Sequence, residues 1–250
     1  MFAFVQKARK PFDTNVFITS PKEPKMIVID SFLDQSTYKE VLQDPIFFPE
    51  SMGDGEKIAE ELNSYHYEQS SCYAPYMFWD GWWRSPANTL KKRVVQSIWE
   101  NHLKAPQEDI LGFEYWTRTF TAGQYLDLHV DEDTFMYEET KMFQGPFDGC
   151  VFYGADNREG GFIEIHSSSP QLVDGSELGL ERKTIDKAQS PLEDRERIAY
   201  RGNRLVIFDT GHVLHATTPA KSGIRQVMVI NVWHRDNPPT ALSKGTFYYE

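Results

Sequence analysis

The stretch that decides the fold is Phe120-Thr-Ala-Gly-Gln-Tyr-Leu-Asp-Leu-His-Val-Asp131. Aliphatic side chains recur at every second position of its latter half. A period of two is typical of a β-strand, in which successive side chains point to opposite faces. We therefore expect His129 and Asp131 to project from one face, and the aliphatic residues to enter a hydrophobic layer. That layer would contain Leu126, Leu128 and Val130. Tyr125 and Asp127 would lie on the same face as His129 and Asp131.

The same period continues along the chain after Gly112. Residues common in strands, β-branched and aromatic, are frequent in these segments. The expected strands are Phe113–Phe120, Gln124–Val130, Gly149–Tyr153, Phe162–His166, Arg204–Asp209 and Arg225–His234, with a short one earlier at Met26–Asp30.

Helices are expected in the first half of the chain. The clearest covers about Pro86–Leu103, with Ser85 as its N-cap, and its apolar residues fall on one face. Helices followed by strands indicate an antiparallel barrel or sandwich with the helices on one outer face. Two further helices are expected, one from Ser36-Thr37 to about Gln43 with Glu40 in a capping box, and one at Glu56–Ser64.

The length of 250 residues suits one large β-rich domain. We expect an N-terminal extension over residues 1–24 and a single domain over 25–250. Within the domain, 31–105 would supply helical support and 110–236 the barrel, interrupted by a polar insertion at 167–200.

Composition excludes several classes of function. The formal net charge of −11 disfavours an extended nucleic-acid track, because a phosphate backbone calls for clustered Lys and Arg. No segment is apolar enough to span a membrane, so no membrane partner is expected. Cys72 and Cys150 are far apart and give no disulfide framework, which makes a reducing cytoplasm the default location.

Three side chains could bind one metal ion: His129, Asp131 and His215. Two imidazoles and one carboxylate, with coordination positions left open, form the ligand set of non-haem Fe(II) oxygenases. Catalytic zinc sites use similar ligands, so the trio by itself does not name a reaction. His212 competes with His215 for the third position, and its alternative role is that of a turn residue.

Arg225 follows His215 by ten residues and begins the last expected strand. A guanidinium on an interior face is unfavourable without an anion. Arg225 could therefore hold the distal carboxylate of a dicarboxylic co-substrate, or it could pair with an Asp or Glu of the protein. Asn231 shares its face and is polar among Val and Ile, so it could bind the co-substrate, a metal-ligand histidine or neighbouring backbone.

Several motifs lie in a fixed order over about 113–235: the stretch 120–131, Gly160-Gly-Phe-Ile-Glu164, Asn203-Arg-Leu-Val-Ile-Phe-Asp209, and His215-Ala-Thr-Thr-Pro219 continuing through Gly223-Ile-Arg225 to Trp233. In this order they resemble the 2-oxoglutarate- and Fe(II)-dependent dioxygenases, in particular the prolyl-4-hydroxylase-like branch. The resemblance implies a mainly β fold with flanking helices (α+β), built as a double-stranded β-helix of the jelly-roll or cupin-like kind.

The resemblance also implies a chemistry. Fe(II) would be held by His129, Asp131 and His215, with 2-oxoglutarate as co-substrate bound through Arg225 and with O2 as oxidant. The implied reaction hydroxylates a C–H bond of a peptidyl side chain or an amino acid-like small molecule and releases succinate and CO2. Related halogenases lack the carboxylate ligand, so Asp131 favours hydroxylation over halogenation.

Two positions depart from the family pattern. Many relatives have a tyrosine nine residues before the first ligand, where its hydroxyl helps to bind the co-substrate, and this chain has Phe120 there. Trp233 also lies two residues farther from Arg225 than is common. The missing hydroxyl would have to come from Tyr115, Thr119 or Tyr125.

Other functions stay open on the sequence. A nucleic-acid demethylase of the same superfamily is disfavoured by the acidic balance, and Asn231 stands where that group carries a second arginine. A cupin-like metal-binding protein without oxygenase activity is the other alternative. The aromatic segment Tyr73–Arg84 could be a substrate-facing lid or could fill the seam between helices and barrel.

Overall fold

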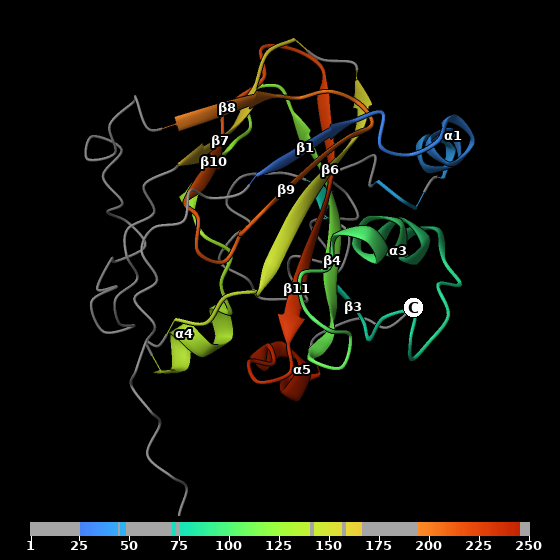
Figure 1. The fold of residues 1–250 in the computed structure, drawn as a ribbon. Helices are drawn as coiled ribbons and strands as arrows, with labels where there is room; N and C mark the ends of the chain where they lie inside the picture. Colours follow the sequence, from blue (N-terminus) through green and yellow to red (C-terminus); the bar gives the residue numbers. More distant parts are fainter. Residues whose placement is uncertain are drawn as a thin grey trace, which may run out of the picture.

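Two antiparallel sheets form the framework of the chain (Figure 1). The computed structural model describes residues 26–44, 46–48, 72–73, 76–140, 143–156, 159–166 and 195–245. Its strands are β1 (Ile27–Asp30), β2 (Cys72–Tyr73), β3 (Met77–Trp79), β4 (Ile110–Thr121), β5 (Leu126–His129), β6 (Asp148–Asp156), β7 (Phe162–His166), β8 (Arg195–Ala199), β9 (Arg204–Phe208), β10 (His215–Thr217) and β11 (Ile224–His234). The larger sheet has the order β1-β9-β6-β11-β4-β2, with β3 also paired to β4, and the smaller sheet has the order β5-β10-β7-β8.

The route of the chain through these sheets defines a double-stranded β-helix. Strands β4, β6, β9 and β11 belong to the larger sheet, whereas β5, β7, β8 and β10 belong to the smaller one. Eight antiparallel strands divided in this way between two sheets form a jelly roll. The expected fold class, mainly β with flanking helices, is therefore confirmed.

A hydrophobic core fills the space between the two sheets. Alternation along β11 sends Val227 and Val229 into this core, whereas Met228 and Ile230 face the other way. We call the first group the barrel core. It consists of Phe120, Val151, Tyr153, Ile163, Ile165, Ile198, Val206, Phe208, Val213 and Val227, with Met26, Leu126, Tyr200 and Val229 packed against it.

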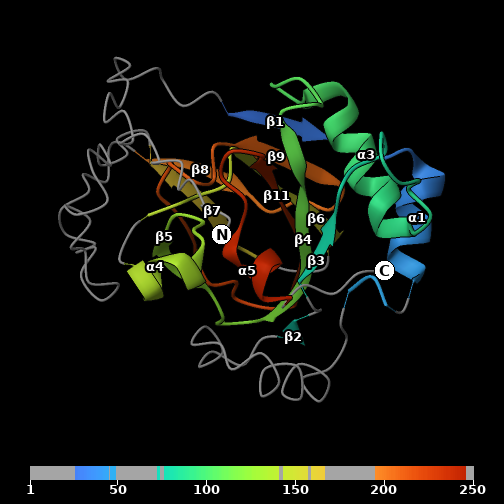
Figure 2. The same ribbon diagram turned by 90° about the horizontal axis from the view of Figure 1, so that it is seen from below.

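The outer face of the larger sheet is covered by helices α1 (Gln35–Gln43) and α3 (Leu90–His102), which Figure 2 shows on the side away from the smaller sheet. α3 buries Leu90, Val94, Val95 and Ile98 in this second core. Two short helices, α4 (Thr134–Thr140) and α5 (Thr240–Lys244), complete the described elements. Among the helices described, none has the length and apolar character needed to cross a membrane.

Both outer helices begin at residues other than those expected. Thr89, not Ser85, caps α3, and its hydroxyl accepts a hydrogen bond from the Lys92 N–H. Asp34, not Ser36 or Thr37, caps α1 by accepting from the N–H groups of both residues. A carboxylate placed before two hydroxyl residues is an equally good cap, and the chain uses the earlier position.

Most expected strands are present at the expected positions, but their ends differ from those expected. β7 has the expected bounds, and β8 lies inside the stretch 167–200 that was expected to be an insertion, so part of that stretch belongs to the framework. The short strand β10 was not expected at all. The extension 1–24, the helix at Glu56–Ser64 and residues 167–194 lie outside the described residues.

The described part of the aromatic segment fills the seam between helices and sheet. Met77–Trp79 is strand β3 on the edge of β4, and Trp79 is 3% exposed. The Phe113 ring stacks with Trp82 at 5.7 Å between centroids and meets Trp83 edge-on at 5.8 Å. These contacts favour packing, not a lid, as the role of this segment.

Candidate metal centre

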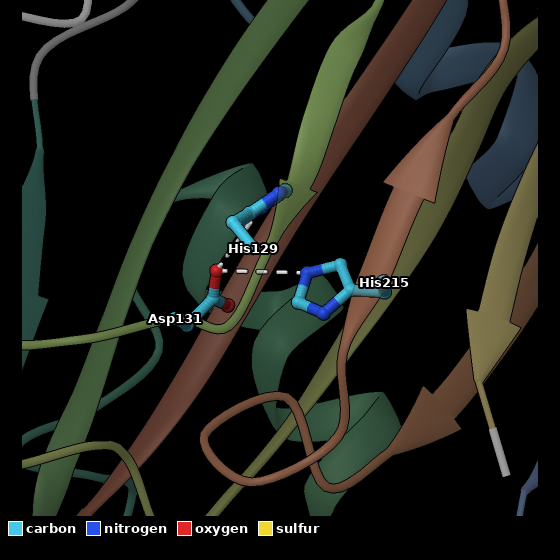
Figure 3. A group of neighbouring side chains, drawn as sticks. All are labelled: His129, Asp131 and His215. Atoms are coloured by element: carbon cyan, nitrogen blue, oxygen red, sulfur yellow. Dashed lines mark ion pairs between the residues drawn. The ribbon is translucent and has the colours of Figure 1, made fainter. Parts of the chain in front are cut away.

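The three expected metal ligands lie together at one edge of the smaller sheet (Figure 3). His129 ends β5 and Asp131 follows two residues later, while His215 begins β10 directly opposite His129. The Nε2 atoms of His129 and His215 each lie 3.7 Å from Asp131 Oδ1. One potential ligand atom from each residue falls within 4.8 Å of the others.

Backbone contacts orient both imidazole rings. His129 Nδ1 lies 2.6 Å from the Asp127 carbonyl oxygen, and His215 Nδ1 lies 2.9 Å from the Val213 carbonyl oxygen. A carbonyl oxygen can only accept, so each Nδ1 carries the proton and each Nε2 keeps its lone pair. The two Nε2 lone pairs are therefore the metal-binding atoms, fixed by the hydrogen bond at the far side of each ring.

Electrostatics keep His215 in the ligand form. Burial lowers the pKa of His215 well below its usual value, and the neighbouring His129 lowers it further. The imidazole is therefore neutral near pH 7, as metal binding requires.

His212 is turned away from this cluster. Its ring lies 2.9 Å from Asp209 Oδ1, its side chain is 54% exposed, and this hydrogen bond raises its pKa. The structure therefore brings His215, and not its competitor, to His129 and Asp131.

The residues present fit a divalent metal ion. Two imidazole nitrogens and one carboxylate oxygen form a set that leaves further coordination positions to other ligands. This set suits Fe(II) and does not by itself exclude zinc. The chain would hold such an ion through His129, Asp131 and His215.

The strand that carries the first ligand is less regular than its sequence indicates. His129 pairs with His215 and Leu126 pairs with Thr217, so a three-residue step in β5 faces a two-residue step in β10. The extra residue is a β-bulge, and it turns Leu126 toward the barrel core. The expectation that Leu126 faces away from His129 is wrong for this reason, and Asp127 is exposed.

Arg225 lies inside the barrel and contacts Thr217, which stands two residues after the metal ligand His215. Its side chain is buried, and its NH2 group donates to Thr217 Oγ1 at 3.0 Å. Thr217 follows His215 by two residues in β10, and its hydroxyl also accepts from the Leu126 N–H at 2.7 Å. A buried cation and the metal ligands thus line one connected site.

Phe120 takes part in this site through its ring face. The Arg225 guanidinium carbon lies 3.9 Å from the ring centroid, and that of Arg118 lies 4.3 Å from it. Both arginines share the interior face of the larger sheet with Phe120, because Arg225 pairs with Phe120 and Val227 pairs with Arg118. Cation–π contacts replace the hydroxyl contact that a tyrosine would have given.

The candidates for the missing hydroxyl have different fates. Tyr115 is fully buried in the core beneath the helices, on the opposite face of β4 from Phe120, so its expected place in the co-substrate pocket is wrong. Thr119 has the same parity as Tyr115 and lies on that face too. Tyr125 is partly buried directly before β5 and stays a candidate.

Asn231 lies on the interior face, as expected, and its side chain contacts other protein groups. Its Oδ1 accepts from Thr210 Oγ1 at 3.1 Å, and its amide lies beside the carboxyl group of Glu114, its cross-strand partner. Burial raises the pKa of Glu114 to about 7, against hydrogen bonds from Trp233 and Asn231, and Asp131 and Asp133 contribute to the rise.

Sequence reasoning missed three residues of this site. Thr217 could have been found, because it shares the face of His215 at a distance of two residues. Arg118 and Glu114 are the charged residues of β4, and both share the parity of Phe120, which is the signal that they lie on the same face as its ring.

Comparisons with known proteins give similarity of fold alone. No family model matches the chain, and no curated protein matches it. A prolyl-4-hydroxylase of Pseudomonas putida is 11% identical, with a TM-score of 0.46 over 84% of this chain and 92% of that chain. HygX of Streptomyces hygroscopicus, solved with nickel and 2-oxoglutarate bound, is 13% identical, with a TM-score of 0.47 over 84% and 82%. A prolyl hydroxylase of Trichoplax adhaerens, in complex with a hypoxia inducible factor peptide fragment, is 13% identical, with a TM-score of 0.47 over 87% and 86%.

Proposed function

We propose that this chain is an Fe(II)- and 2-oxoglutarate-dependent dioxygenase that hydroxylates a C–H bond. The observation that carries the proposal is the convergence of His129, Asp131 and His215 next to a buried guanidinium. Thr217 connects the two parts, because it lies two residues from His215 and accepts a hydrogen bond from Arg225. One site then offers a ligand set for ferrous iron and a cation for a carboxylate.

Each residue has a defined task in this proposal. The triad holds Fe(II), which with bound 2-oxoglutarate supplies the activation of O2 and yields succinate and CO2 as co-products. Arg225 binds the C5 carboxylate, and the Thr217 hydroxyl and the Phe120 ring keep its guanidinium in place. The barrel core behind Phe120 keeps water away from this pair and so strengthens it.

We propose a peptidyl side chain or an amino acid-like small molecule as the substrate. The net charge of −11 repels a polyanion at long range, which disfavours nucleic acid. A substrate without a phosphate backbone carries no such penalty.

The test is succinate formation by the purified protein with Fe(II), 2-oxoglutarate and O2. We expect turnover that needs all three additions and that is abolished by His129→Ala or Asp131→Ala without loss of folding. His212→Ala is the matched control for the ligands and should keep one metal ion bound per chain. Stoichiometric metal binding without succinate would refute the oxygenase and leave a cupin-like metal-binding protein. A search of native extract for products that gain one oxygen atom would then identify the substrate.

A further inference from the structure

One turn contacts two of the three candidate metal ligands. It spans Asp209–Val213, between β9 and β10, and is closed by a hydrogen bond from the Val213 N–H to the Asp209 carbonyl oxygen at 2.9 Å. The Thr210 carbonyl oxygen accepts from the Asp131 N–H at 2.9 Å. The Val213 carbonyl oxygen lies 2.9 Å from His215 Nδ1. The position of this turn therefore decides where both ligands lie.

A buried polar network ties the turn to the larger sheet. Thr210 is fully buried, and its hydroxyl donates to Asn231 Oδ1 at 3.1 Å on β11. Asn231 is the cross-strand partner of Glu114 on β4, so its amide lies beside the Glu114 carboxyl group and stabilises the charged form of that group. The Trp233 indole N–H donates to the same carboxyl group at 2.8 Å. Three neighbouring elements thus meet in one polar network that ends at the Asp131 backbone.

The packing around this network leaves no room for adjustment. Gly149 lies opposite Asn231 in β6, and a Cβ atom there would come within 2.2 Å of Thr210 Oγ1 and 2.9 Å of Asn231 Oδ1. A Cβ on Gly211 would come within 2.5 Å of the Pro146 carbonyl oxygen. The two glycines hold the turn against its neighbours at distances that a larger residue would not allow.

We propose that Glu114, Asn231 and Thr210 are positioning residues that set the geometry of the metal site through the Asp209–Val213 turn. An amide suits the middle of this network, because its oxygen accepts from Thr210 while its NH2 group can donate to the neighbouring Glu114. A carboxylate at position 231 could not donate to an ionised Glu114, and an aliphatic side chain could make neither bond. The inference rests on the proposed metal site but does not require oxygenase activity.

The direct test is the affinity of the full chain for Mn2+, measured by calorimetric titration without co-substrate. Thr210→Val keeps the shape of the side chain and removes the hydrogen bond to Asn231. We expect it to raise the Mn2+ dissociation constant by roughly 10- to 100-fold, the usual effect of removing an outer partner of a ligand. Thr117→Val is the matched control: Thr117 is also fully buried, and its hydroxyl has no hydrogen-bond partner within the described part of the chain.

A second pair of variants separates positioning from simple loss of packing. Asn231→Asp places two carboxyl groups side by side and should weaken Mn2+ binding. Adding Glu114→Gln exchanges the carboxylate and the amide, so the carboxylate can accept from both Thr210 and the new amide. We expect this double variant to regain most of the Mn2+ affinity, which a mere packing role would not predict.

The possible outcomes are distinguishable. Equal Mn2+ affinity in Thr210→Val and Thr117→Val, with binding lost in His129→Ala, would overturn the network and leave the metal site intact. No Mn2+ binding by the wild type would overturn both. Circular dichroism of each variant shows whether it has folded, and the isosteric Asn231→Asp pair decides the matter if Thr210→Val does not fold.

Discussion

At the scale of single residues, Phe120 influences how Arg225 would bind the carboxylate of a co-substrate. Its ring lies against the guanidinium groups of both Arg225 and Arg118, so it orients cations but donates no hydrogen bond. The hydroxyl next to Arg225 comes instead from Thr217, on the strand that carries the ligand His215. Strand β10 therefore connects the residue that would bind the co-substrate, Arg225, with the metal ligand His215.

Arg225→Gln should raise the 2-oxoglutarate requirement sharply. One charge-assisted bidentate pair contributes about 2–3 kcal/mol, which corresponds to roughly 30- to 150-fold in KM. The initial rate of succinate formation against 2-oxoglutarate concentration measures it. Arg93→Gln, which removes an exposed arginine on α3 paired with Glu40, is the control and should leave KM unchanged. An unchanged KM in Arg225→Gln would remove this residue from the co-substrate site.

Glu114 should make the stability of the metal-free protein fall as pH rises. Its pKa is about 7 in the folded chain against an ordinary 4.5, so between these values the folded state keeps a proton that the unfolded state has released. The contribution of Glu114 to the free energy of unfolding is fully present below pH 4.5. It falls by up to about 3 kcal/mol as the pH rises to 7 and above. The side chain in Glu114→Gln does not titrate. Urea unfolding should therefore show that the free energy of unfolding of this variant rises relative to that of the wild type between pH 5 and 8. Parallel pH curves would contradict this assignment.

At the residue scale, the sequence could predict ligands but not contacts. His129, Asp131, His215 and Arg225 carry the chemistry in their side chains and stand at spacings that strand parity explains. The hydrogen bond between Thr217 and Arg225 depends on how β10 in the smaller sheet faces β11 in the larger one, and no local pattern encodes that distance. Tyr115 was expected in the co-substrate pocket, but it is five residues from Phe120 and so lies on the opposite face of β4. The sequence alone does not show which face of the strand points inward.

At the scale of elements, β11 and β5 show when alternation can be trusted. β11 pairs on both sides over most of its length, so its alternation holds and sends Arg225 and Asn231 to the same face. β5 has four residues and pairs with the three-residue β10, where one extra residue changes the register. Long central strands are therefore predictable from sequence, whereas short strands at the mouth of a barrel are set by tertiary pairing.

The start of α3 provides a test at this scale. Thr89→Ala removes the hydroxyl that accepts from the Lys92 N–H and should lower the free energy of unfolding by about 1 kcal/mol. Ser97→Ala on the same helix is the control, because its exposed hydroxyl only bonds to the Arg93 carbonyl oxygen. Its effect should stay within about 0.5 kcal/mol. Urea unfolding measures both, and equal effects would mean that Thr89 is not the cap.

For the whole molecule, the two sheets differ in how they are supported. The larger sheet is buried on both faces, by the barrel core and by α1 and α3. The smaller sheet contributes two of the metal ligands, His129 from β5 and His215 from β10, and these strands join through a short pairing with a bulge. A metal ion would cross-link these two strands where their backbone pairing is short and irregular.

Metal binding should therefore stabilise the molecule through the smaller sheet. At a free Mn2+ concentration of about 100 times its dissociation constant, the free energy of unfolding should rise by about 2.7 kcal/mol, because the ion binds only the folded chain. A chelator should reverse the gain, and His215→Ala should show none. Amide hydrogen exchange locates the effect: slowing is expected in β5 and β10 but not in β1 and β9, whose pairing lies in the other sheet. Uniform slowing in both sheets would show that the ion does not act as a local cross-link.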